Sequence, residues 1–307
     1  MTMKRIGILG LGGVGGYFGG LLASAYYKSD EIEVIFIARG ETQKAIAESG
    51  LKIITDDAEN VVYPKMVSNN PDEIGVLDYL ICATKTYDIE ESLLSLQQCI
   101  APETVILPLY NGVDAPERIL QLFPENDILQ GCVYVISMIF SPGTIRKIGF
   151  YEKLFFGSKT VSVSKLNELQ SIFEKAKVES YLVENIEETV WEKFIFISAL
   201  ASVTSYLNMN IGQILSNPDA KAVYVELLKE IELVANAKGL QLPDDIVSQT
   251  IIKLEKSPKE ATSSMHRDYL AGNKIEATSL TKFVVEEGLK YGVKTPLYEK
   301  ISTVLLS

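Results

Sequence analysis

The sequence predicts an α/β protein in which an N-terminal Rossmann-type doubly wound sheet is followed by an all-helical C-terminal domain. Three observations indicate this class. Short apolar runs alternate with helical patterns through the first half of the chain, and a glycine-rich turn follows the first run. After about Asn185 only helical periodicity continues, so we expect one domain over 1–185 and a second over 186–307.

The first half has the alternating rhythm of βαβ units, which predicts a parallel sheet covered on both faces. Expected strands are Arg5–Gly10, Glu33–Ala38, Asp78–Thr84, Thr104–Tyr110 and Val133–Phe140. Expected helices are Gly13–Ser24, Glu41–Ser49, Ile89–Ile100 and Ala115–Phe123. Two less regular segments, 51–67 and 143–158, are typical of added hairpins or edge strands, and 164–183 would supply a last helix and strand.

The second half carries apolar residues at three- and four-residue spacing, which predicts helices. They are expected at Glu187–Leu207, Pro218–Lys238, Asp244–Leu254 and Ile275–Tyr291. Gly239, Gly292 and Pro296 act as stops. The change of period therefore marks the boundary between the domains.

The composition excludes several functions. With 29 Lys+Arg against 40 Asp+Glu, the net charge of −11 opposes the basic surface that nucleic acid or an anionic membrane requires, so we expect neither partner. One His and three dispersed Cys do not suit the common zinc sites, so no metal is expected. No targeting segment or spanning apolar stretch is evident, and a cytoplasmic protein is expected.

The turn after the first strand matches the GxGxxG dinucleotide-binding fingerprint, and its residues are Gly10, Leu11, Gly12, Gly13, Val14 and Gly15. The fingerprint needs a tight turn at Gly10, close approach of a pyrophosphate at Gly12, and close helix–strand packing at Gly15. An apolar strand precedes the turn and an apolar helix follows it, which is the required context. The alternative is a glycine-rich βα turn without a ligand.

Arg39 follows the second strand, at the position that distinguishes the two nicotinamide dinucleotides. NAD sites usually place an acid there for the ribose 2′-hydroxyl, whereas an Arg accommodates the 2′-phosphate. No acid stands beside Arg39, so NADP (NADPH) is the predicted cofactor. The alternative is a solvated surface arginine.

Lys85 and Asn111 each follow a predicted strand, at the sheet edge where doubly wound folds bind ligands. Lys85 could place positive charge near a carboxylate or phosphate, and Asn111 could bond the nicotinamide ribose or the substrate. Each also has a simpler interpretation, because loop lysines are mostly solvated and Asn-Gly is a common turn.

Lys193 stands near the start of a helix that is apolar on nearly all sides. Such a helix is buried, and burial disfavours the charged amine. It therefore lowers the pKa of a lysine toward values that suit proton transfer. A lysine extending to water from the first helical turn is the equally weighted alternative.

A second polar cluster contains Ser264 and Glu276. Ser264 offers a hydroxyl to a substrate carboxylate or hydroxyl. Glu276 falls at the start of the predicted helix Ile275–Tyr291, where a carboxylate also favours the helix dipole without any catalytic role. His266 is the only imidazole, and its polar neighbours make catalysis the less favoured interpretation.

These features resemble the ordered motif set of the ketopantoate reductases, also called 2-dehydropantoate 2-reductases, over nearly the full chain. The motifs are the glycine turn, Arg39, Thr84-Lys85-Thr86, Asn111-Gly112, Trp191-Glu192-Lys193-Phe194, Ser263-Ser264-Met265 and Ala271-Gly272-Asn273-Lys274-Ile275-Glu276. The resemblance implies an NADP-binding Rossmann domain and a helical domain that hold a small 2-oxo acid in the cleft between them. It also implies that Lys193 is the general acid, that Glu276 binds the substrate and supports Lys193, that Ser264 contacts the substrate, and that Asn111 and Lys85 complete the site.

The sequence departs from the family pattern at Ile197 and Ala201, where the family usually has asparagines four and eight residues after the lysine. Both stay near the face of the lysine, so they belong to the predicted substrate site. Thr278 also stands where an Asp often occurs. These changes leave three hypotheses: reduction of 2-dehydropantoate, reduction of another branched 2-oxo acid, or a catalytically idle NADP sensor. A homodimer is compatible with each of them.

Overall fold

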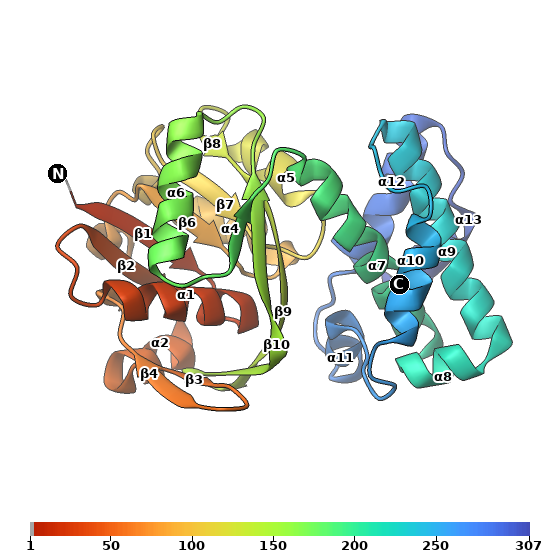
Figure 1. Cartoon of the computed structure of the whole chain (residues 1–307), viewed down its shortest axis with the longest axis horizontal. Coiled ribbons are helices and arrows are strands. Elements are labelled where there is room, and N and C mark those ends of the chain that lie inside the picture. The colour runs from red at the N-terminus through yellow and green to blue at the C-terminus, as the bar shows by residue number, and fades with distance from the viewer. Residues whose placement is uncertain (1–2) are drawn as a thin grey trace. The chain divides into compact units, whose positions relative to one another are not determined.

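The computed structural model describes residues 3–307, which divide into two compact units (Figure 1). The first unit takes the chain up to Tyr110 together with Ala115–Ile186, and the second takes Asn111–Asp114 and Glu187–Ser307. The four residues 111–114 lie inside the range 1–185 but group with the helical unit. The domain boundary at residue 185 stays a prediction. Across the described chain, no helix combines the length and the apolar character needed to cross a bilayer.

A six-stranded parallel sheet forms the centre of the first unit. Across the sheet its strands are β5 (Met66–Ser68), β2 (Ile32–Ile37), β1 (Lys4–Leu9), β6 (Tyr79–Cys82), β7 (Val105–Pro108) and β8 (Asp127–Ile128). Leu9 pairs with Ile37 on one side and Cys82 on the other, so the carboxyl ends of three strands meet at one edge. The chain order reverses between β1 and β6, and ligands of doubly wound sheets bind at that point.

Helices cover both faces of this sheet, as the sequence predicts. They are α1 (Gly13–Tyr26), α2 (Gly40–Ser49), α3 (Pro71–Ile74), η1 (Thr86–Asp88), α4 (Ile89–Leu94), η2 (Gln97–Cys99), α5 (Ala115–Leu122) and α6 (Val163–Lys175). Alternate strand residues divide between two cores: Val34 and Phe36 pack in the core that α1 and α6 share, and Ile35 and Ile37 in the core that α3, α4 and α5 share. A strand buried on both faces therefore reads as a continuous apolar run.

A second sheet contains the segments that the sequence treats as irregular. It consists of β3 (Leu51–Ile54), β4 (Glu59–Val62), β9 (Gln130–Ser141), β10 (Thr144–Gly157) and β11 (Ser180–Leu182). The expected assignment of Val133–Phe140 to the parallel sheet is wrong, because this segment lies in β9 and pairs antiparallel with β10 (Figure 1). Strand propensity and an apolar run establish that a strand forms but not which sheet it joins.

The glycines of α1 let this helix pack between the two sheets. A Cβ at Gly19 would come within 2.9 Å of Ile8, in the parallel sheet. A Cβ at Gly16 would come within 2.6 Å of Ile145, and one at Gly20 would overlap Ile53, both in the second sheet. Neighbouring positions on α1 thus lack side chains because both sheets come close to this part of the helix.

The second unit is helical, and its core is built on α7. Its elements are α7 (Ile186–Leu207), α8 (Ile211–Ser216), α9 (Pro218–Lys238), α10 (Ile246–Glu255), α11 (Ser264–Leu270), η3 (Thr278–Lys282), α12 (Phe283–Tyr291) and α13 (Pro296–Leu305). The helix expected over Ile275–Tyr291 is corrected in two respects. It begins at Ala277, after Ile275 and Glu276, and its first part, η3, is π-helical. Apolar spacing of three and four residues does not reveal such a turn.

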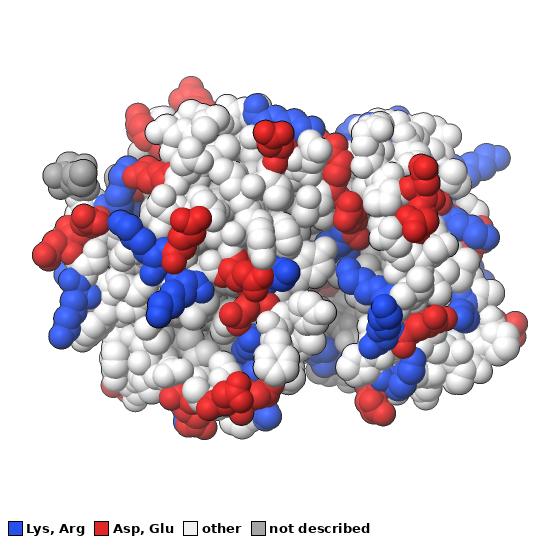
Figure 2. All heavy atoms as spheres, in the orientation of Figure 1, with Lys and Arg blue, Asp and Glu red and all other residues white. Residues whose placement is uncertain are grey.

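Charged side chains of both signs are interspersed over the face of the molecule that Figure 2 shows. Several pair at the surface, including Lys221 with Glu255 at 2.9 Å and Lys165 with Asp127 at 2.7 Å. Exposed pairs of this kind contribute at most about 1 kcal/mol each. These surface ion pairs therefore contribute little to the stability of the fold.

Candidate functional site

The glycine turn between β1 and α1 has the geometry that its fingerprint requires. Gly10 has a positive φ of +89°, and a Cβ there would lie 2.8 Å from the amide nitrogen of Thr84. A Cβ at Gly15 would overlap the carbonyl oxygen of Gly10, so the helix could not approach the strand with any larger residue there. Leu11 is buried and Val14 is half-buried, and both pack in the core below the turn.

Gly12 differs from the other glycines because neither its φ nor a close neighbour requires a glycine there. Its φ of −74° suits any residue, and a Cβ would meet nothing within 4 Å. Among the glycines of residues 3–307, no other combines an ordinary φ with open space. Gly12 precedes α1, whose first amides and dipole favour an anion. The open space at Gly12 fits the role that the fingerprint gives this glycine, which is to let a phosphate group approach the backbone.

Gly13 serves a different purpose from the other glycines of the turn. A Cβ at Gly13 would overlap the carbonyl oxygen of Ser137 in β9. The second sheet therefore lies directly against the start of α1 and fixes the position of the turn. This contact was not predicted, because the sequence does not show that β9 belongs to another sheet.

Arg39 lies beyond the carboxyl end of β2 and directly precedes α2. Its side chain is 76% exposed and its Nη1 lies 3.7 Å from Oε1 of Glu91, which is equally exposed. A solvated ion pair at that distance holds the guanidinium only weakly. Arg39 can therefore reorient toward an anionic group at the end of β2.

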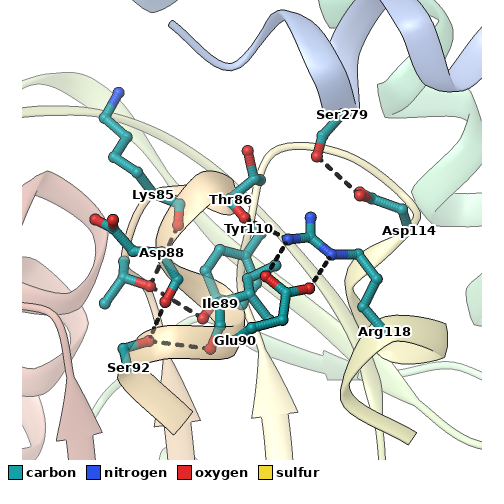
Figure 3. Close-up of polar contacts among 11 residues, drawn as sticks. Lys85, Thr86, Asp88, Ile89, Glu90, Ser92, Tyr110, Asp114, Arg118 and Ser279 are labelled. Atoms are coloured by element: carbon teal, nitrogen blue, oxygen red, sulfur yellow. Dashed lines mark hydrogen bonds and ion pairs between the residues drawn. The ribbon is translucent and has the colours of Figure 1, made fainter. Parts of the chain in front are cut away.

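The loop after β6 contains Lys85 and is held by a partly exposed ion pair between Arg118 and Glu90 (Figure 3). Arg118 of α5 donates from Nε and Nη2 to the two carboxylate oxygens of Glu90, each at 2.7 Å, and from Nη2 to the carbonyl oxygen of Thr86 at 2.8 Å. The guanidinium lowers the pKa of the Glu90 carboxyl. Figure 3 shows Lys85 pointing away from this pair, at the carboxyl end of β6.

Lys193 and Asn111, 82 residues apart in the chain, meet in the second unit. The Lys193 ammonium donates to Oδ1 of Asn111 at 3.0 Å, and Lys193 is only 7% exposed. Trp191 and Phe194 pack edge to face, with ring centroids 5.4 Å apart, and bury this turn of α7. Since burying an unpaired ammonium is costly, the amide of Asn111 stabilises the lysine at this depth and fixes its direction.

Glu276 and Ser264 occupy other parts of the same unit. Glu276 is 4% exposed and directly precedes the helix that begins at Ala277, and its carbonyl oxygen accepts from the amide of Leu280 at 3.0 Å, so it is a buried acidic residue at the helix start. Ser264 is the first residue of α11 and is half-buried. The cap of α11 is the preceding Ser263, whose Oγ accepts from the amide of His266 at 3.0 Å.

His266 is a structural residue of α11. Its Nε2 lies 2.9 Å from Oδ1 of Asn208 and its Nδ1 lies 2.6 Å from Oγ1 of Thr262. A neutral imidazole satisfies both contacts, donating from Nε2 and accepting at Nδ1. Burial lowers the pKa of His266, which keeps the ring neutral.

Ile197 and Ala201 lie one and two turns after Lys193 on α7. Ile197 is half-buried, whereas Ala201 is 2% exposed. The sequence did not single out Arg118, which holds the Lys85 loop in the first unit, or Asp114 and Ser279, which contact each other in the second unit. Their partners are distant in the chain, so no local pattern could identify them.

Models of the ketopantoate reductase family match most of the chain. "Ketopantoate reductase PanE/ApbA" matches residues 6–160, and "Ketopantoate reductase PanE/ApbA C terminal" matches residues 185–306. The crystal structure of 2-dehydropantoate 2-reductase from Porphyromonas gingivalis W83 is 32% identical, with a TM-score of 0.86 and full coverage of both chains.

Two curated relatives extend this picture. An uncharacterized oxidoreductase, YkpB, of Bacillus subtilis is 25% identical over 96% of this chain and 95% of its own. The 2-dehydropantoate 2-reductase of Pyrococcus abyssi is 27% identical over 95% of this chain and 94% of its own. The fold, the ordered motifs and these matches agree: the chain belongs to the ketopantoate reductase family, whose members are NAD(P)-dependent oxidoreductases that act on CH–OH groups.

Proposed function

We propose that this oxidoreductase uses NADPH to reduce 2-dehydropantoate to (R)-pantoate, in pantothenate and coenzyme A biosynthesis. The observation that carries the proposal is the buried Lys193 ammonium directed at Asn111. The names of the relatives from Porphyromonas gingivalis and Pyrococcus abyssi support the choice of substrate.

The first unit supplies the features that a dinucleotide needs. Gly12 leaves space for the pyrophosphate at the start of α1, and Arg39 offers a mobile guanidinium to a 2′-phosphate at the end of β2. Lys85 adds positive charge beyond β6, at the side of the sheet where the chain order reverses. When bound, NADPH supplies the hydride that reduces the ketone carbon.

The second unit supplies the proton. As the carbonyl oxygen gains negative charge, Lys193 donates a proton from Nζ to it, so that the carbon–oxygen double bond becomes a C–OH group. Asn111 accepts from the ammonium and thereby orients the proton that is transferred. Glu276, a buried carboxylate, would hold the substrate and support the lysine, and Ser264 would contact the substrate.

A second candidate keeps this chemistry but takes another branched 2-oxo acid. Ile197 and Ala201 favour it, because an isoleucine and an alanine cannot provide the two amides that a polar substrate would use. Each lost hydrogen bond changes recognition by about 1 kcal/mol. The half-buried Ile197 would instead contact an apolar side chain.

Rates of NADPH oxidation decide between these functions. We would compare kcat/KM for 2-dehydropantoate with kcat/KM for a panel of 2-oxo acids that have branched apolar side chains. Preference for 2-dehydropantoate is expected, and preference for the panel would select the second candidate. If no 2-oxo acid accelerates NADPH oxidation while NADPH still binds, the chain is a sensor and both proposals fail. Ile197→Asn should shift preference toward 2-dehydropantoate if Ile197 contacts the substrate.

A further inference from the structure

Three hydrogen bonds from hydroxyl groups hold the π-helical turn η3, two from α7 and one from η3 itself to Asp114. Ser198 of α7 donates from Oγ to the carbonyl oxygen of Leu280 at 2.6 Å, and Ser202 lies 2.9 Å from Oγ1 of Thr281. Ser279 donates from Oγ to Oδ2 of Asp114 at 2.8 Å (Figure 3). A π turn departs from the regular helical ladder and frees a carbonyl, and such turns are frequent at functional sites. Here the freed carbonyl of Leu280 accepts the hydrogen bond from Ser198.

The contact between Ser279 and Asp114 joins η3 to the short segment that carries Asn111. Ser279 is 1% exposed and Asp114 is 8% exposed, so the contact is shielded from water. Between Asn111 and Asp114 the chain turns at Gly112, whose φ is +134°. A Cβ at Gly112 would lie 2.9 Å from Oδ1 of Asp114, so the carboxylate packs against the turn itself.

A continuous path therefore runs from η3 to the ammonium of Lys193. Ser279 fixes Asp114, Asp114 packs against the turn at Gly112, and the turn places the amide of Asn111. Asn111 then accepts from Lys193 at 3.0 Å. The three other side chains of this path belong to segments that are far from α7 in the chain, so the direction of the lysine depends on contacts that its own helix does not provide.

We propose that Ser279 and Asp114 are positioning residues, which act through Asn111 to aim the Lys193 ammonium at the group it protonates. This proposal rests on the proposed function only for its catalytic readout. Neither residue needs to touch the substrate. Since a misplacement of about 1 Å at a reacting group can cost on the order of a hundredfold in rate, Ser279→Ala should lower kcat about tenfold or more. The KM for NADPH should change little, because most of its expected contacts, at the glycine turn, Arg39 and Lys85, lie in the first unit.

Ser202→Ala is the matched control. It also removes one buried hydroxyl from the clamp on η3, but its partner is Thr281 and not the segment of Asn111. Both variants should lose similar stability in thermal unfolding. Only Ser279→Ala should lower kcat. Only this variant should also shift the part of the pH–kcat profile in which the general acid loses its proton. Equal loss of kcat in both variants would overturn the proposal and leave a purely structural clamp.

A double-mutant cycle tests the path. In an Asn111→Ala background, Ser279→Ala should lower kcat no further, because the group it positions is gone. Additive losses would overturn the proposal. If the wild-type protein reduces no 2-oxo acid, the proposed function fails, but the path can still be tested. The measurement is then the rate at which acetic anhydride acetylates Lys193. Mass spectrometry should then show the same altered rate in Ser279→Ala and Asn111→Ala but not in Ser202→Ala, and an unaltered rate in Ser279→Ala would overturn the path.

Discussion

Replacing Gly12 by alanine separates the cost of ligand binding from the cost of folding. The backbone at Gly12 has φ −74° and ψ −165°, which alanine adopts without strain, and the added methyl group would meet nothing within 4 Å. Loss of glycine freedom in the unfolded chain stabilises the protein by about 0.4–1 kcal/mol. Gly12 is also the N-cap of α1, a position at which alanine is worse than glycine by a similar amount. We therefore expect the free energy of unfolding of Gly12→Ala to stay within about 1 kcal/mol of the wild type.

Binding of the dinucleotide should change much more. The methyl group occupies the space through which a pyrophosphate would approach the start of α1, and inserting a methyl group into a close contact costs about 1–3 kcal/mol. At a factor of ten for each 1.4 kcal/mol, the Kd for NADPH should rise about 5- to 150-fold. NADH should weaken by the same factor, because the two cofactors share the pyrophosphate.

Isothermal titration calorimetry with both cofactors, together with urea unfolding, measures these quantities. Gly13→Ala is the comparison, because its Cβ would overlap Ser137 and should therefore lower stability as well as binding. An unchanged Kd for NADPH in a stable Gly12→Ala variant would refute the assignment of the pyrophosphate to this turn.

Three further predictions concern residues outside the glycine turn. Arg39→Ala should raise the Kd for NADPH by about tenfold or more while leaving NADH unchanged, since only a charge-assisted contact to the 2′-phosphate is lost; equal weakening of both cofactors in calorimetry would argue against NADP. Arg118→Lys should lower the free energy of unfolding by about 1 kcal/mol, because an ammonium cannot reproduce the fork that binds Glu90; urea unfolding that matches the wild type would contradict this. The His266 pKa should lie below 6.5, so stability should be complete above pH 6.5 and fall as the pH drops through it. NMR titration of this single imidazole checks the sign, and His266→Gln should remove that part of the pH dependence.

Local signals predict the parts of this protein that depend on local chemistry. Gly10, Gly12 and Gly15 occupy the positions that the fingerprint assigns, because a tight βα turn leaves few choices of residue. The helix over Glu187–Leu207 agrees with α7 to within one residue, since a long segment that lacks Gly and Pro and is apolar on nearly all sides indicates a buried helix.

Contacts between distant segments account for what the sequence did not predict. The segment Val133–Phe140 was assigned to the wrong sheet because its partner, β10, is recognisable only once the hairpin forms. Glu276 stands at the start of the helix, as expected, but the π turn that follows it was not predicted because Ser198 and Ser202 of the distant α7 hold it. The hydrogen bond between Asn111 and Lys193 was not predicted; the family resemblance placed both residues in one site, but no spacing rule joins residues 82 positions apart.

The most direct test of this account is the rate of reduction by Lys193→Ala. Stopped-flow measurement of NADPH oxidation, at saturating 2-oxo acid, follows hydride transfer, the step that proton donation by Lys193 assists. A general acid contributes about 10²- to 10⁴-fold, so kcat should fall by that factor, the Kd for NADPH should stay the same, and added methylamine should restore part of the rate. A kcat within about threefold of the wild type would fall outside that range and contradict the role assigned to Lys193.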